Sequence, residues 1–148
     1  MKCFAEIQKL AEEKILDAEC LAAGGRYDAS FYMAGYAVEL YLKAKVCQTL
    51  GIENFYDFDD PNRKRQLKDA NRDRAFRIHD VQQLLIISGV FTTFMNDLDT
   101  GVTPGLKQAW SLIIDWNENT RYILDKTQQQ IIDLLKAIKI FETWILQH

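Results

Sequence analysis

Apolar residues recur every three to four positions over most of the chain, which is the spacing of one face of an α-helix. The first such run covers residues 4–21 and is followed by a pair of glycines, where we expect a tight turn to reverse the chain. The second run, residues 26–50, is apolar or small on nearly every side, so it predicts a central helix that is buried on most faces. Asp28 is a candidate N-cap of this helix, and Gly51 follows its last residue.

The pattern is lost over residues 52–76, which are mostly polar and include a proline after two aspartates, so we expect a long irregular loop. Periodicity returns in two shorter runs, at residues 80–87 and 91–98, each of which predicts a short helix. Together these runs predict a succession of helices joined by turns.

From Leu106 onward the chain is helical in pattern again, with a stripe that includes Trp110, Ile113 and Leu124 and has Arg121 at its edge. Thr127 and Gln130 form a capping box that opens the last helix. Apolar spacing also continues between the two segments, so residues 105–147 could form one helix or two; we favour a break near Arg121.

No stretch alternates apolar and polar residues as a strand does, and the 148 residues suit one hydrophobic core. We therefore expect a single all-α domain over residues 1–148, an antiparallel up-and-down bundle of about five helices. No apolar run approaches the ~20 residues of a membrane span, and the first residues lack a signal-peptide core, so we expect a cytoplasmic protein without membrane contact.

Charge and cysteine content exclude several classes of protein. The net charge of −3 and the isoelectric point near 5.4 give no global field that would draw the chain to nucleic acid, so any such binding must be local. Three cysteines far apart in sequence predict reduced packing residues rather than a disulfide framework or a zinc site. There is no phosphate-binding glycine loop and no cluster at metal-ligand spacing, so no metal or other cofactor is expected.

The central helix contains one line of polar residues. Tyr32, Tyr36, Glu39 and Lys43 are spaced four, three and four residues apart, which places them on one stripe of the helix. Glu39 and Lys43 could pair with each other at the rim of the bundle. Because a buried carboxylate needs a partner and a guanidinium binds it with two donors, we also hypothesise a contact between Glu39 and Arg121 across helices.

Three blocks in this order resemble the HEPN domain: AGYAVELYLKA at 34–44, HDVQQLL at 79–85, and W-x4-RY at 116–122. The resemblance implies a helical bundle that often forms a homodimer. It also implies a non-catalytic module that binds a nucleotide, an RNA or a small nucleotidyltransferase, with Glu39, Lys43, Arg121 and Tyr122 as the residues at the ligand. HEPN relatives also include metal-independent endoribonucleases of toxin type, which are the alternative function.

The ribonuclease branch of this family has an arginine followed four to six residues later by a histidine. No histidine follows Arg121 at that distance, which argues against ribonuclease activity, and Ile123 replaces the proline that usually follows the RY pair. Arg74 and His79 do have the required spacing, but His79 also matches the histidine that opens a helix in the second block. Catalysis would use Arg121 with Tyr122, or Arg74 with His79.

A local cluster of basic residues precedes His79 and is interleaved with aromatic residues. It could bind phosphates and stack bases, or it could be a solvated loop whose charges are partly balanced by nearby acidic residues. The basic residues are Arg63, Lys64, Arg65, Lys68, Arg72, Arg74 and Arg77, and the aromatic residues are Phe55, Tyr56, Phe58 and Phe76.

Overall fold

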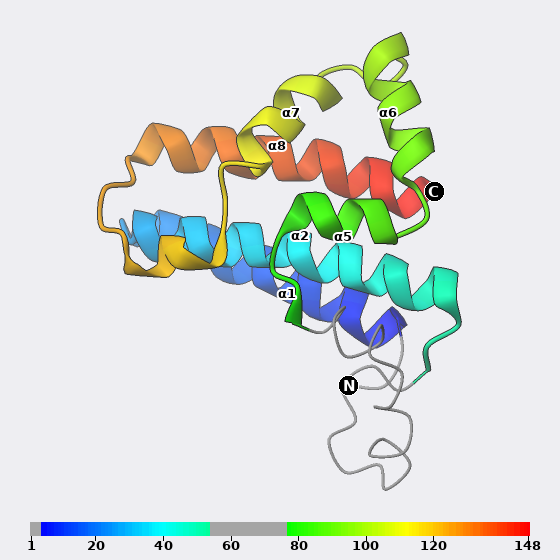
Figure 1. Ribbon diagram of the computed structural model, residues 1–148. Coiled ribbons are helices and arrows are strands. Elements are labelled where there is room, and N and C mark those ends of the chain that lie inside the picture. Colours follow the sequence, from blue (N-terminus) through cyan, green and yellow to red (C-terminus); the bar gives the residue numbers. More distant parts are fainter. Residues whose placement is uncertain (1–3, 54–76) are drawn as a thin grey trace, which may run out of the picture.

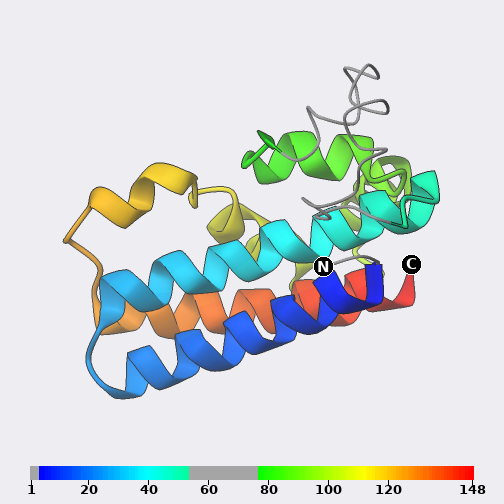
Figure 2. The ribbon, with the colours of Figure 1, turned by 90° about the horizontal axis from the view of Figure 1, so that it is seen from below.

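Three long helices form the body of the molecule in the computed structural model, which describes residues 4–53 and 77–148. They are α1 (Phe4–Ala23), α2 (Tyr27–Leu50) and α8 (Gln128–Gln147), and they lie side by side (Figure 1). α2 returns antiparallel to α1, and α8 runs in the same direction as α2 (Figure 2). The described residues contain no strand, so the predicted all-α bundle is confirmed.

Shorter helices cover the long ones. They are α5 (Val81–Ile87), α6 (Phe91–Thr100), α7 (Leu106–Ile113) and the 3-10 helix η1 (Glu118–Tyr122). α5 and η1 pack on α2, whereas α7 packs on α8 (Figure 1). The described ranges thus contain six α-helices where the sequence predicted about five.

α2 is the centre of the core because it contacts α1, α5, α8 and η1. This arrangement explains why its apolar residues appear on every side, as the sequence predicted, whereas α1 buries only the stripe Ile7, Ala11, Ile15 and Ala18. None of the described helices is both long enough and apolar enough to cross a membrane.

The start of α2 differs from the prediction. The N-cap is Arg26, without a side-chain hydrogen bond, while Asp28 is the second residue of the first turn. The Asp28 Oδ1 atom instead accepts a hydrogen bond of 2.9 Å from the backbone N–H of Lys126. Asp28 therefore links α2 to the segment before α8. The predicted end of α2 at Gly51 is confirmed, with the glycine at a φ of 61°.

The break before α8 lies earlier than we predicted. α7 ends at Ile113 instead of near Arg121, and Leu124, which was placed on its apolar stripe, is 86% exposed. The chain turns away because Trp116 packs flat against α2: a Cβ atom at Gly35 would lie 2.1 Å from the indole ring. The capping box of Thr127 and Gln130 is present as predicted.

Aromatic residues hold α6, α7 and α8 together. The ring of Phe94 on α6 meets Trp110, Phe141 and Trp144 edge to face at centroid distances between 4.8 and 6.3 Å. The indole N–H of Trp144 donates a 2.8 Å hydrogen bond to Asp97, which is also buried. Phe94, Phe141 and Trp144 are buried core residues, and Trp110 packs against them partly buried.

Candidate binding site on helix α2

The predicted polar stripe of α2 lies under η1 and the start of α5. The rings of Tyr32 and Tyr36 stack at 6.3 Å with an interplanar angle of 11°, which joins the two halves of the stripe. Burial, followed by the charge of Glu39 and the neighbouring Tyr32, raises the pKa of Tyr36, so its hydroxyl stays protonated at neutral pH. One end of the stripe is closed and charged, and the other is open.

The closed end is a cluster of Glu39, Lys43, His79 and Glu118, which we call the Glu39 cluster. The Lys43 ammonium donates a 2.5 Å hydrogen bond to Glu39, and Glu39 and Lys43 are each 1% exposed. The His79 Nδ1 atom lies 3.1 Å from both carboxylate oxygens of Glu39. Because an ionised carboxylate only accepts hydrogen bonds, Nδ1 carries the hydrogen, and Nε2 faces Glu118 at 3.6 Å.

The hypothesis of a contact between Glu39 and Arg121 is wrong. The pairing of Glu39 with Lys43 is confirmed, but it lies inside the core and not at the rim of the bundle. The partner that Glu39 finds across the fold is His79, which directly precedes Asp80, the N-cap of α5. Arg121 lies at the solvent-exposed end of η1 with its guanidinium 4.9 Å from the ring centroid of Tyr122. It does not reach the core because the chain leaves α7 at Ile113 and passes along the surface of α2 (Figure 1).

The open end of the stripe is a cleft of about 320 Å³, which we call the Arg–Tyr cleft. It lies between the first turns of α2 and the segment that ends η1. Hydrogen bonding to Tyr122, and more weakly to Tyr32, raises the pKa of Arg121, which therefore remains a cation at any physiological pH. The cleft is lined by Gly25, Arg26, Tyr27, Asp28, Ala29, Tyr32, Arg121 and Leu124.

The cleft carries a surplus of positive charge. Within the described ranges neither Arg26 nor Arg121 forms an ion pair, while one oxygen of Asp28 already accepts the Lys126 N–H. The first turn of α2 also has no side-chain cap, and the partial positive charge of a helix N-terminus favours anions. An anionic group in the cleft would thus lie near two arginines and one aspartate.

The sequence reasoning missed Arg26 and Tyr27. A signal for them was present, because the dipeptide Arg-Tyr occurs twice in the chain, at 26–27 and at 121–122. Only the second copy was recognised, through its resemblance to a family motif. The fold brings both arginines to one cleft.

Several candidate residues lie outside the described ranges. They include Arg74 and the whole basic cluster except Arg77, which is exposed next to the segment that carries His79. Among the described residues no three His, Cys, Asp or Glu side chains are arranged to hold a metal ion. Of the cysteines, Cys47 is buried in the core as predicted, while Cys20 is exposed on α1.

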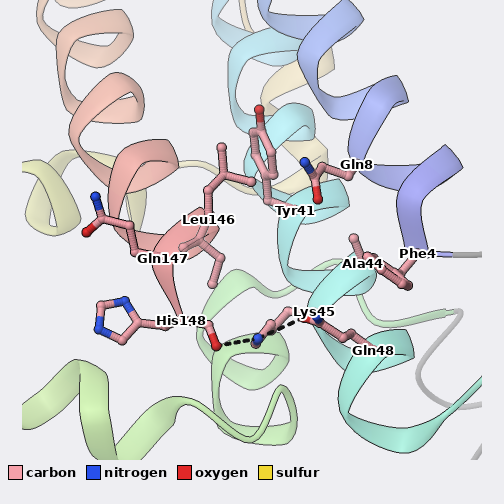
Figure 3. Close-up of a pocket in the computed structure, with 10 residues that line it drawn as sticks. Phe4, Gln8, Tyr41, Ala44, Lys45, Gln48, Leu146, Gln147 and His148 are labelled. Atoms are coloured by element: carbon pink, nitrogen blue, oxygen red, sulfur yellow. Dashed lines mark hydrogen bonds between the residues drawn. The ribbon is translucent and has the colours of Figure 1, made fainter.

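A second pocket of about 270 Å³ lies between the ends of α1, α2 and α8 (Figure 3). Its one ammonium group, Lys45, already donates to the backbone carbonyl of His148 at 2.5 Å and to Gln48 at 2.8 Å. The hydroxyl of Tyr41, at the inner wall of the pocket, donates a 2.5 Å hydrogen bond to Glu142. This pocket contains none of the predicted site residues, and its ammonium group is already hydrogen-bonded, so it is the weaker candidate for a ligand.

Comparison of the chain with models of protein families, with curated proteins and with solved structures gives no significant match.

Proposed function

We propose that this chain is a non-catalytic binding module that holds a nucleotide or a segment of single-stranded RNA in the Arg–Tyr cleft. One observation carries the proposal: two arginines without ion-pair partners in the described ranges line one cleft together with two tyrosines. Guanidinium groups bind phosphate oxygens with two parallel donors, and a tyrosine ring gives a base a surface for stacking.

Arg121 lines the cleft with its guanidinium 4.9 Å from the ring centroid of Tyr122, so it is available to bind a phosphate. Tyr32 lines the cleft itself, and Tyr122 is 74% exposed beside it, so a base could stack on either ring. By alanine substitution, stacking on an aromatic side chain contributes about 1–3 kcal/mol per base.

Glu39 and Lys43 have a supporting role in this proposal, because each is only 1% exposed and their charges bind each other. They fix the closed end of the stripe, next to the stacked rings of Tyr36 and Tyr32. The homodimer and the small nucleotidyltransferase partner that the HEPN resemblance implies belong to the same proposal. The exposed apolar residues Ile123 and Leu124 next to the cleft would give such a partner a surface to contact.

The test is a titration of the purified protein with nucleotides and short single-stranded RNA at two salt concentrations, following thermal stability and binding. A ligand that binds only the folded protein raises its stability by about 2.7 kcal/mol at one hundred times its dissociation constant. We expect stabilisation that weakens with salt and is lost in Arg121→Met. Lys9→Gln, which removes an exposed charge on α1 away from the cleft, is the matched control.

Absence of binding by any nucleotide or RNA would overturn the proposal. Equal binding by wild type and Arg121→Met would show that the ligand occupies another part of the molecule.

A second candidate, a metal-independent endoribonuclease, is favoured by the geometry of His79. A carboxylate at Nδ1 orients an imidazole so that its Nε2 can move protons, and the side chain of His79 is 42% exposed. Glu118 and Arg121 are three residues apart on η1, so 3-10 geometry aligns them on the same side of that helix. A base and a phosphate-binding cation could thus act on one RNA strand.

Cleavage of RNA in the presence of a chelator, lost in His79→Gln, would favour this candidate over the binding module. A pure protein that binds RNA and leaves it intact over hours excludes it.

A further inference from the structure

We infer that the Arg–Tyr cleft selects a nucleotide with a terminal phosphate, either a free mononucleotide or the phosphorylated end of an oligonucleotide, rather than an internal phosphodiester. The inference rests on the proposed function, and it adds the chemical class of the ligand. Three features of the cleft lead to it: its size, its charge, and its pair of tyrosines.

The size of the cleft limits what can enter. Its volume of about 320 Å³ is at the lower end of the range for small-molecule sites, which suits one nucleotide better than several. Its walls come from two short segments, residues 25–32 and 121–124, and the hydrogen bond from Lys126 N–H to Asp28 ties them together. The two walls are thus held close together around a space that suits one nucleotide.

The charge of the lining distinguishes the two kinds of phosphate. Two arginines and one aspartate give the lining a formal surplus of one positive charge. A phosphodiester has one negative charge and two terminal oxygens, while a monoester has a charge of about −1.5 to −2 at neutral pH and three terminal oxygens. The monoester offers more acceptor oxygens and more negative charge than the diester, so two guanidinium groups bind it more strongly.

Arg26 is the residue that makes this distinction. Arg121 alone could bind either kind of phosphate, because one guanidinium group needs only two oxygens. A second guanidinium group in the same cleft is better satisfied by a phosphate that has a third terminal oxygen and additional charge. Tyr27 and Tyr32 lie in the same lining, so the ligand also has a ring that stacks, which favours a nucleotide over a sugar phosphate.

The experiment compares ligands that differ only in the phosphate. Dissociation constants are measured by calorimetry for AMP and cyclic AMP, and for the trinucleotide ApApA with and without a 5′-phosphate. We expect at least one monoester to bind on the order of tenfold more tightly than its matched ligand without a terminal phosphate, the effect of one charge-assisted hydrogen bond. Arg26→Met should abolish this preference, and Lys9→Gln should retain it.

Each outcome bears on the inference. Tighter binding of AMP alone identifies a free mononucleotide as the ligand, and tighter binding of the phosphorylated trinucleotide alone identifies an oligonucleotide end. Equal binding of the paired ligands, with both weakened in Arg121→Met, overturns the inference and leaves the proposed function intact. Ribose 5-phosphate binding as tightly as AMP overturns the role of the tyrosines, and no binding by any ligand overturns the proposed function as well.

The variants remain folded if the inference is correct, because Arg26 and Arg121 are both exposed. Melting temperatures of the unliganded variants within a few degrees of wild type confirm this. A preference that survives in a folded Arg26→Met variant contradicts the role of Arg26.

Discussion

The Glu39 cluster and the Arg–Tyr cleft are the two ends of one polar stripe on α2, and they differ in what their charges contact. Glu39 is 1% exposed and is bound by Lys43 and His79. Arg121 is exposed beside a cleft, and it forms no ion pair within the part of the chain that the structure describes. A buried charge must be paired because its desolvation costs several kcal/mol, so it supports the fold. An exposed, unpaired charge costs the fold little and is free to bind a ligand.

Replacement of Glu39 by glutamine is the strongest test of this contrast. We expect Glu39→Gln to lower the free energy of unfolding by about 3–5 kcal/mol, the usual result of breaking a buried ion pair from one side. The measurement is denaturant unfolding, with Glu118→Gln at the half-exposed edge of the same cluster as the control. A loss of only a few tenths of a kcal/mol, typical of surface pairs, would mean that the cluster does not support the fold.

Gly35→Ala tests how the two ends are joined, because Trp116 lies against Gly35 and leads into η1. The new Cβ would lie 2.1 Å from ring atoms of a tryptophan that is 3% exposed, so the indole must move. We expect a loss of about 1–3 kcal/mol, although alanine is otherwise the better helix former. Thermal unfolding measures it.

Gly35→Ala should cost less in a Trp116→Leu background than in the wild type, since the smaller side chain removes the overlap. An increase in stability in Gly35→Ala alone would show that Trp116 does not pack there.

The titration of Tyr36 tests the boundary between the two ends. Burial raises its pKa in the folded protein above the ordinary value near 10, so the unfolded chain loses this proton first. The stabilisation is therefore complete below pH 10 and is lost as the pH rises through the higher, folded-state pKa, by about 1.4 kcal/mol per pH unit for one such tyrosine.

Unfolding curves between pH 8 and pH 11 measure this slope. Tyr36→Phe should decrease it. The pKa of Tyr41 is also raised, by burial and by its hydrogen bond to Glu142. Tyr41 should therefore contribute a separate part of the slope, which Tyr41→Phe removes. An unchanged slope in Tyr36→Phe would mean that this hydroxyl is exposed to solvent.

The smallest expected effect on stability is that of Arg121→Met. Because the side chain is exposed and outside any ion pair among the described residues, the free energy of unfolding should change by no more than about 0.5 kcal/mol. The same variant should lose ligand binding. A large loss of stability would show that Arg121 supports the fold as Glu39 does. The two regions would then not differ in the role of their charges.

Most of the helices could be predicted from the sequence because their signals are local. The apolar stripe of α1, the glycine after α2 and the capping box of α8 each depend on residues within one or two turns of one another. The prediction was wrong between Ile113 and Thr127, where apolar spacing continued but the helix did not. There the contact between Trp116 and Gly35, which are far apart in sequence, decided the path of the chain.

The residues of the candidate site likewise include some that local sequence signals predict and others that only the tertiary structure brings together. The sequence by itself determined the stripe of Tyr32, Tyr36, Glu39 and Lys43, because helical periodicity places residues of one helix on one face. Only the tertiary structure decided that His79 binds Glu39, and that Arg26 and Arg121 line one cleft. Such pairings depend on where separate segments meet in space, which is set by packing of the whole core and has no periodicity along the chain.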